Sequence, residues 1–231
     1  MAEINSTLGN IRGKVGNVIL YEGRNGKTLA RGAWLVRKAS EEPQKRQSAV
    51  FGTLTKLKRR LKPVIDIGFP GNGKTLKGCN AFMSVNSKEV VTVEKIKPSK
   101  KLSKRKTAIQ EFKAKIDISK LRVASGPLLS PSVEAEIDTK QKEARFRHRA
   151  ILVNAADCFL DDRIHAALVD EGKWIALSKE ICLRGEDGEE TVKIPDNMDP
   201  KRVVLYAFAT SADGRYASDS VCLHVPKQEK E

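Results

Sequence analysis

Residues 203–209 read VVLYAFA, and residues 216–225 read YASDSVCLHV. Both runs are rich in β-branched and aromatic residues, which favour strands. In the first run, the side chains at 203, 205 and 207 would point to the opposite face from those at 204, 206 and 208. The tetrapeptide ADGR at 212–215 lies between the runs, and Asp-Gly is a frequent hairpin turn. The sequence therefore predicts an antiparallel strand pair near the C-terminus.

Five further segments upstream have strand composition and are separated by turn signals. They are residues 132–138, 143–153, 162–170, 173–183 and 189–194. Short strands at this spacing are typical of an antiparallel β-sandwich. We therefore expect residues 121–231 to form an antiparallel β-sandwich domain.

The first part of the chain has different patterns. Residues 11–37 predict a β-hairpin with a turn at 22–27, where the pair Asn25-Gly26 tolerates positive φ. Tyr21 and Trp34 lie beside cations of the two arms. Such aromatic side chains either stack on single-stranded nucleic acid or pack a small core, and the sequence leaves both alternatives open.

An amphipathic helix is expected over residues 43–62. Its apolar side chains Val50, Leu54, Leu57 and Leu61 follow helical spacing, and Pro63 should end or kink the helix. A shorter helix is expected near residues 76–86, and strands are expected at 89–97 and 112–119. The predicted fold class is thus α+β, with an N-terminal β-hairpin and helices followed by the β-sandwich.

Charge divides the chain unevenly. Residues 1–120 carry 27 Lys and Arg against 9 Asp and Glu, whereas residues 121–231 carry 16 against 20. This contrast predicts a basic hairpin–helix domain over 1–120, including a lysine-rich segment at 97–106, and a separate domain over 121–231. A basic domain attracts nucleic acid, anionic lipid or an acidic protein surface.

The cations that we expect to contact such an anion are Arg12, Lys14, Arg24, Lys27, Arg31, Lys56, Arg59, Arg60, Lys100, Lys101, Lys104, Arg105 and Lys106. A second group, Arg145, Arg147 and Arg149, alternates along one predicted strand. That row either binds an anion or pairs with acids of neighbouring strands, which is the commoner outcome.

One stretch suggests an enzyme. Residues 68–75 read GFPGNGKT, which matches the phosphate-binding pattern G-x-x-x-x-G-K-[ST]. A functional loop of this kind follows a strand of a parallel sheet, and no second βαβ unit is visible here. We interpret the stretch as a turn between two helices, and nucleotide binding there remains the less favoured alternative.

No other catalytic, cofactor or metal signature is present. The four cysteines form no C-x-x-C pair, and the three histidines are far from metal-ligand spacing. We expect reduced thiols, although Cys158 or Cys182 could pair with Cys222 in an oxidising environment. We therefore expect no catalytic residues, no cofactor and no metal, and we interpret the protein as not an enzyme.

Several short motifs occur in a specific order. They are GKVGNV at 13–18, PQKRQ at 43–47, VLYAF at 204–208, DGR at 213–215 and SDS at 218–220. In this order the chain resembles an uncharacterised Bacteroidota family, a domain of unknown function, over nearly its whole length. The resemblance implies a basic N-terminal hairpin–helix unit followed by a fibronectin- or immunoglobulin-like domain. It implies no catalytic residues, cofactor or partner, and residues 97–106 are more basic than it leads us to expect.

These observations favour a non-enzymatic binding or assembly protein whose basic domain engages a polyanion, most simply nucleic acid without sequence specificity. The alternative is a structural component of a larger assembly, such as a virion or envelope complex, that makes contacts through the β-sandwich as a homo- or hetero-oligomer. No run is long enough to span a bilayer, and the N-terminus lacks the features of a secretory signal. We therefore expect a cytoplasmic or virion-associated protein.

Overall fold

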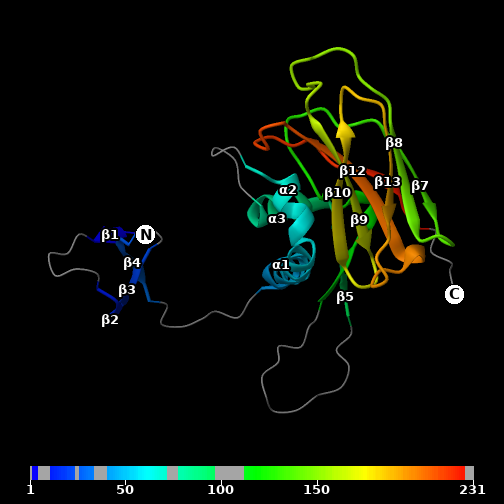
Figure 1. Cartoon of the computed structure of the whole chain (residues 1–231). Coiled ribbons are helices and arrows are strands. Elements are labelled where there is room, and N and C mark those ends of the chain that lie inside the picture. The colour runs from blue at the N-terminus through cyan, green and yellow to red at the C-terminus, as the bar shows by residue number, and fades with distance from the viewer. Residues whose placement is uncertain are drawn as a thin grey trace. The chain divides into compact units, whose positions relative to one another are not determined.

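The computed structural model describes residues 2–4, 11–23, 26–33, 41–71, 78–96 and 112–226. The chain divides into two compact units, Met1–Glu42 and Pro43–Glu231, and each is described by itself (Figure 1). The boundary expected from charge, between residues 120 and 121, lies inside the second unit. Compactness and charge thus divide this chain at different places.

The first unit is a four-stranded antiparallel sheet. Its strands are β1 (Ala2–Ile4), β2 (Gly13–Val15), β3 (Val18–Glu22) and β4 (Thr28–Gly32), in the order β1-β4-β3-β2. The predicted hairpin is present as β3 and β4. Its expected first arm is divided, because the chain turns at Gly16, whose φ of 57° lies in the left-handed region that favours glycine. Asn25 and Trp34 lie outside the described residues.

Three helices open the second unit: α1 (Glu42–Arg60), α2 (Lys62–Gly68) and α3 (Cys79–Glu89). The predicted apolar stripe of α1 is confirmed, since Val50, Leu54 and Leu57 are buried. Pro63 lies in the first turn of α2, where backbone N–H groups have no acceptor within the helix. The missing N–H of proline therefore costs no helical hydrogen bond. The proline thus begins a new helix after α1 ends. No described helix is both long and apolar enough to cross a bilayer.

The β-rich part of this unit contains all seven predicted strands. They are β7 (Val133–Asp138), β8 (Glu143–His148), β9 (Arg163–Asp170), β10 (Ile175–Leu183), β11 (Gly188–Lys193), β12 (Val203–Thr210) and β13 (Val221–His224). They form two antiparallel sheets, β11-β8-β7 and β10-β9-β12-β13. Phe146 of the first sheet shares a core with Leu168 and Leu205 of the second, so the two sheets pack face to face.

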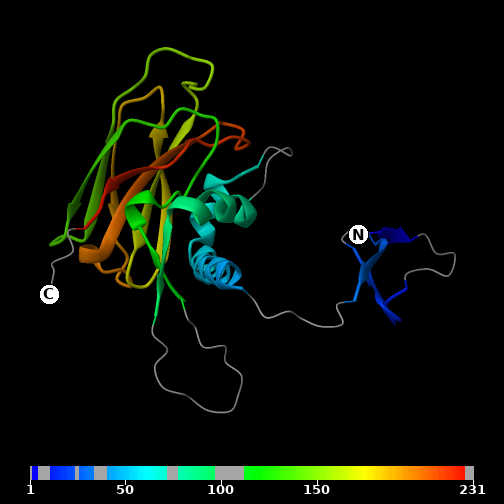
Figure 2. The ribbon, with the colours of Figure 1, turned by 180° about the vertical axis from the view of Figure 1, so that it is seen from behind.

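The helices cover the face of the sheet β10-β9-β12-β13 that points away from β11-β8-β7 (Figure 2). Tyr206 and Phe208 of β12 belong to the same hydrophobic cluster as Leu54 of α1 and Phe82 of α3. Every residue of β12 is therefore buried, with alternate side chains in two different clusters. Because the helices and the sheets share a core, the described residues between 43 and 120 pack as part of the β-rich unit.

A two-stranded antiparallel ribbon extends from this unit. It consists of β5 (Val91–Lys95) and β6 (Phe112–Ile116). A short 3-10 helix follows the ribbon at Ile118–Lys120, and another precedes β12 at Pro200–Arg202. Lys95 pairs with Phe112. Residues 97–106 lie outside the described residues, but the connection that contains them starts and ends at neighbouring positions of the ribbon. The architecture as a whole is α+β.

Candidate functional site

The predicted anion-binding cations are distributed over both units. Arg12, Lys14, Lys27 and Arg31 belong to the first unit, and Lys56, Arg59 and Arg60 belong to α1 of the second. Arg24, Lys100, Lys101, Lys104, Arg105 and Lys106 lie outside the described residues. Each unit therefore carries its own candidate surface.

The outward face of α1 carries the first candidate surface. Lys56, Arg59 and Arg60 are all exposed, and their i, i+3, i+4 spacing places them on one side of the helix, away from the buried leucines. None of the three forms an ion pair with another described residue. Cations in the last turn also interact favourably with the helix dipole, which helps to hold α1 in this form. The result is a local excess of unneutralised positive charge.

The ribbon carries further cations that were not among the predicted site residues. Lys113 and Lys115 of β6 are exposed, which follows from the two-residue period of this strand. The Arg46 guanidinium of α1 lies over the Phe112 ring, 5.7 Å from its centroid. Arg46 and Lys113 thus lie next to the point where the lysine-rich connection rejoins the fold. Nothing local in the sequence indicates the Arg46–Phe112 contact.

The sheet of the first unit offers a face with both cations and an aromatic ring. Its register places Lys14, Ile19 and Arg31 in one row across three strands, and Tyr21 shares their face. The Arg31 guanidinium lies over the Tyr21 ring, 5.7 Å from its centroid. A sheet face that combines cations with an aromatic side chain suits single-stranded nucleic acid. The Tyr21 side chain is half-buried, and its ring is already in contact with Arg31.

Arg12 and Arg147 have acidic partners. Arg12 forms an ion pair with Glu22. In β8, the Arg147 Nε lies 3.2 Å from the Glu189 Oε1 of β11, and this hydrogen bond raises the pKa of Arg147. A hollow of about 590 Å³ beside Arg147 is lined by both acidic and basic side chains. Of the two alternatives for this row, pairing with acids of a neighbouring strand is confirmed for Arg147.

The phosphate-loop pattern is described only at its start. Residues 64–67 belong to helix α2, whereas a phosphate-binding loop requires a strand there. A Cβ at Gly68 would lie 2.4 Å from the Val123 carbonyl oxygen, so this glycine permits a close backbone approach. Lys74 and Thr75 lie outside the described residues. Packing therefore accounts for the first glycine of the pattern.

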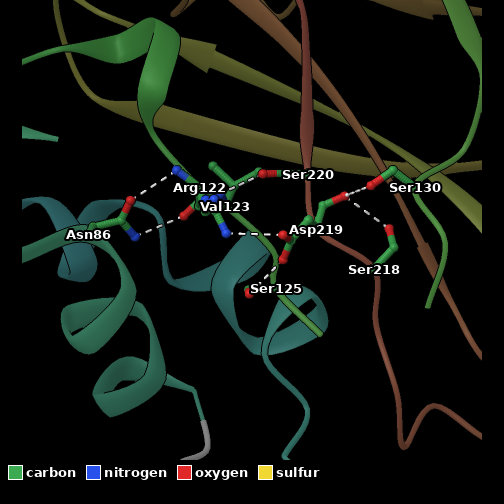
Figure 3. Close-up of polar contacts among 8 residues, drawn as sticks. All are labelled: Asn86, Arg122, Val123, Ser125, Ser130, Ser218, Asp219 and Ser220. Atoms are coloured by element: carbon green, nitrogen blue, oxygen red, sulfur yellow. Dashed lines mark hydrogen bonds and ion pairs between the residues drawn. The ribbon is translucent and has the colours of Figure 1, made fainter. Parts of the chain in front are cut away.

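A network of polar side chains joins the helices to the β-rich part, and we call it the polar bracket (Figure 3). It comprises Asn86, Arg122, Val123, Ser125, Ser130, Ser218, Asp219 and Ser220. Buried Asn86 donates from Nδ2 to the Arg122 carbonyl oxygen at 2.9 Å and accepts from the Arg122 backbone N–H at 2.9 Å. This pair of bonds fixes α3 to the segment that leads into the sheets.

Asp219 is the centre of the second half of the bracket. Its Oδ2 accepts from Arg122 at 3.0 Å, its Oδ1 accepts from the Ser125 hydroxyl at 2.6 Å, and its backbone oxygen accepts from Ser130 at 2.9 Å. The SDS motif at 218–220 thus holds the connection between β12 and β13 against the start of the β-rich part. All the partners of this carboxylate are structural, so the bracket positions backbone segments.

The buried titratable groups also have structural roles. Burial lowers the pKa of His165, which stacks on Phe208 and bonds the Thr210 hydroxyl at 2.9 Å. Burial raises the pKa of Tyr206, whose hydroxyl donates to the Ile118 carbonyl oxygen at 2.6 Å. Among the described residues, no group of three or more His, Cys, Asp and Glu side chains could hold a metal ion, and the four cysteines are free.

Comparison of the chain with family models, with curated proteins and with solved structures finds no match. A functional assignment must therefore come from the geometry and the charge of the chain itself.

Proposed function

We propose that this protein is a non-enzymatic binding protein whose basic region engages a polyanion, most simply nucleic acid, through its phosphates. The observation that carries the proposal is the outward face of α1, where Lys56, Arg59 and Arg60 are exposed and have no acidic partner among the described residues. Arg46 and the ribbon cations add to this charge, as does the sequence of residues 97–106.

Phosphate contacts of this kind fix orientation and carry no base specificity. Lys and Arg side chains on a helix surface can follow a backbone of regularly spaced charges. The binding energy then comes mainly from release of condensed counterions, which makes affinity strongly dependent on salt. We therefore expect similar affinity for random sequences and no preference for one base.

The test is fluorescence anisotropy of the full chain with labelled random single-stranded DNA, between about 50 and 200 mM salt. The informative variant replaces Lys56, Arg59 and Arg60 together with alanine. Each lost contact should reduce the slope of log K against log salt by about 0.7, so three contacts should reduce it by about 2.

A matched control replaces Lys140, Lys193 and Lys201, which are also exposed and have no ion pair among the described residues. This triple variant removes the same charge from the less basic part of the chain, and its slope should equal that of the wild type. No binding at the lowest salt, or affinity that is flat with salt, would refute the proposal. Equal losses in both triple variants would show that only net charge matters.

We further propose that β7–β13 form a sandwich of the fibronectin or immunoglobulin class, as the resemblance to the Bacteroidota family implies. The support is the strand order: the first, second and fifth strands form one sheet, and the third, fourth, sixth and seventh form the other. In that class the end loops often bind other proteins, so this part would contribute protein contacts within a larger assembly. A cytoplasmic or virion-associated location stays a prediction.

A further inference from the structure

One end of the β-rich part exposes an unusual group of apolar side chains, which we call the apolar tip. It comprises Leu129, Leu152, Val153 and Phe159, which are 48%, 82%, 72% and 42% exposed. Three of them belong to the connection between β8 and β9, in which residues 150–156 carry no charge. Neighbouring exposed apolar side chains of this kind mark interaction sites.

The backbone of the tip is held in place from several sides. The Leu129 N–H donates to the Asp157 carbonyl oxygen at 2.7 Å, and the Ile151 N–H donates to the Arg184 carbonyl oxygen at 3.1 Å. The Leu160 N–H bonds the Asn154 side chain at 2.9 Å. These bonds bring the start of β7, the β8–β9 connection and the β10–β11 turn to the same end of the sheets.

A buried ion pair supports the tip from below. Arg184 and Asp162 have side chains that are 0% and 1% exposed, and the Arg184 Nε lies 3.2 Å from the Asp162 Oδ2. The Arg184 Nη2 also donates to the Leu129 carbonyl oxygen at 2.7 Å, and Asp162 accepts from the Phe159 N–H at 3.0 Å. Both ends of the tip are thus tied to one charged pair. A preorganised surface loses little conformational entropy when it binds a partner.

The surroundings of the tip are acidic. Exposed carboxylates stand beside it on the same connections: Asp157, Asp161, Glu186 and Asp187. The exposed cation on these connections is Arg149. This rim disfavours an anionic lipid surface or a nucleic acid as the occupant. It favours a protein surface that combines an apolar contact with positive charge.

The same chain presents such a surface on α1. Phe51 is 42% exposed, and the i, i+7 spacing puts Lys58 on its side of the helix. Lys58 is half-buried, and exposed Arg59, at i+8, borders the same side. The acidic rim and apolar tip of one molecule therefore complement the Phe51 side of α1, with its cations Lys58 and Arg59, in another.

We propose that the apolar tip of one chain docks on the Phe51 side of α1 in a second copy, so that the protein assembles head to tail. The two surfaces differ, so the contact is heterologous, and the resulting dimer still offers one free surface of each kind. Such contacts generate rings or open filaments, depending on whether the rotation closes.

The test is sedimentation velocity of the full chain over a concentration series from micromolar to hundreds of micromolar. The wild type should form species larger than dimers at the high end of the series, and more of them at low salt. One variant carries Leu152→Asp and Val153→Asp, and a second carries Phe51→Asp. Each should weaken association roughly tenfold or more, since buried apolar anchors dominate interface energies. A Val225→Asp control, at a residue that is 41% exposed, should behave as the wild type.

Mixing the two variants gives the decisive result. Each lacks one surface and keeps the other, so an equimolar mixture should form a dimer and nothing larger. Thermal unfolding checks that both variants stay folded, as expected for such exposed positions. A wild type that is monomeric throughout overturns the proposal. It is also overturned if the tip variant abolishes association and Phe51→Asp does not, because that result indicates tip-to-tip dimers.

Discussion

Asn86 should be among the most sensitive polar positions of the second unit. Its side chain is fully buried and forms three hydrogen bonds: two with the backbone of Arg122 and one with the Phe82 carbonyl oxygen. Replacement by alanine removes all three and leaves the Arg122 N–H and carbonyl without these partners. At about 1 kcal/mol for each bond, Asn86→Ala should lower the free energy of unfolding by about 3 kcal/mol. For a unit of this size, that loss corresponds to a fall in Tm of roughly 6–12 °C.

The assay is urea denaturation, followed by far-UV circular dichroism and by tryptophan fluorescence in a Trp34→Phe background, so that Trp174 reports on the β-rich part. Because the helices and the sheets share a core, the two signals should change together in the wild type and in the variant. The variant should have a lower midpoint and the same slope. Asn80→Ala, at an exposed position of the same helix, is the matched control and should change stability by less than about 0.5 kcal/mol.

Two results would refute this reasoning. A loss no larger than that of the Asn80 control would mean that the bracket contributes nothing to stability. Separate transitions for the two signals would mean that residues 43–120 unfold independently of the sheets. The boundary predicted from charge would then also be the boundary of cooperative folding.

Three other substitutions follow from the same structure. Gly68→Ala places a Cβ 2.4 Å from the Val123 carbonyl oxygen, and thermal unfolding should show a loss of about 1–3 kcal/mol. Tyr206→Phe leaves the buried Ile118 carbonyl oxygen without its donor, and the urea midpoint should fall by an amount equivalent to about 1–2 kcal/mol. Burial lowers the pKa of His165, so the unfolded chain binds this proton more readily. Stability should therefore fall as the pH drops below about 6.5, and His165→Gln should reduce that fall in a series of urea midpoints against pH.

The secondary structure was predictable because the signals for it are local. The run at 203–209 has strand composition, and its alternate side chains do enter different clusters. The stripe of α1 and the position of Pro63 likewise depend on spacing within a few residues. In α1 and β12, the periodicity of apolar residues in the sequence matches the pattern of buried side chains in the fold.

The contacts between the elements were not predictable, since they depend on residues far apart in the chain. Asn86 and Arg122 are separated by 36 positions, and Arg122 and Asp219 by 97. Polar side chains at these positions have the composition of ordinary loops. The charge contrast suggested a domain boundary at 120/121, but surface charge does not report which apolar faces pack together. Gly68 matched a catalytic pattern, and its packing reason, the close approach of Val123 and Ala124, is visible only in the fold.

The pairing of β5 with β6 suggests that the basic connection between these strands can be replaced. Because Lys95 and Phe112 are paired, the chain leaves and rejoins the ribbon at one place. Even a doubling of this connection would raise the loop-closure cost by only about 0.6 kcal/mol. We therefore expect that its length and charge can be changed by design while the fold stays the same. The ribbon is accordingly the natural place to graft a fluorescent tag or a different binding sequence.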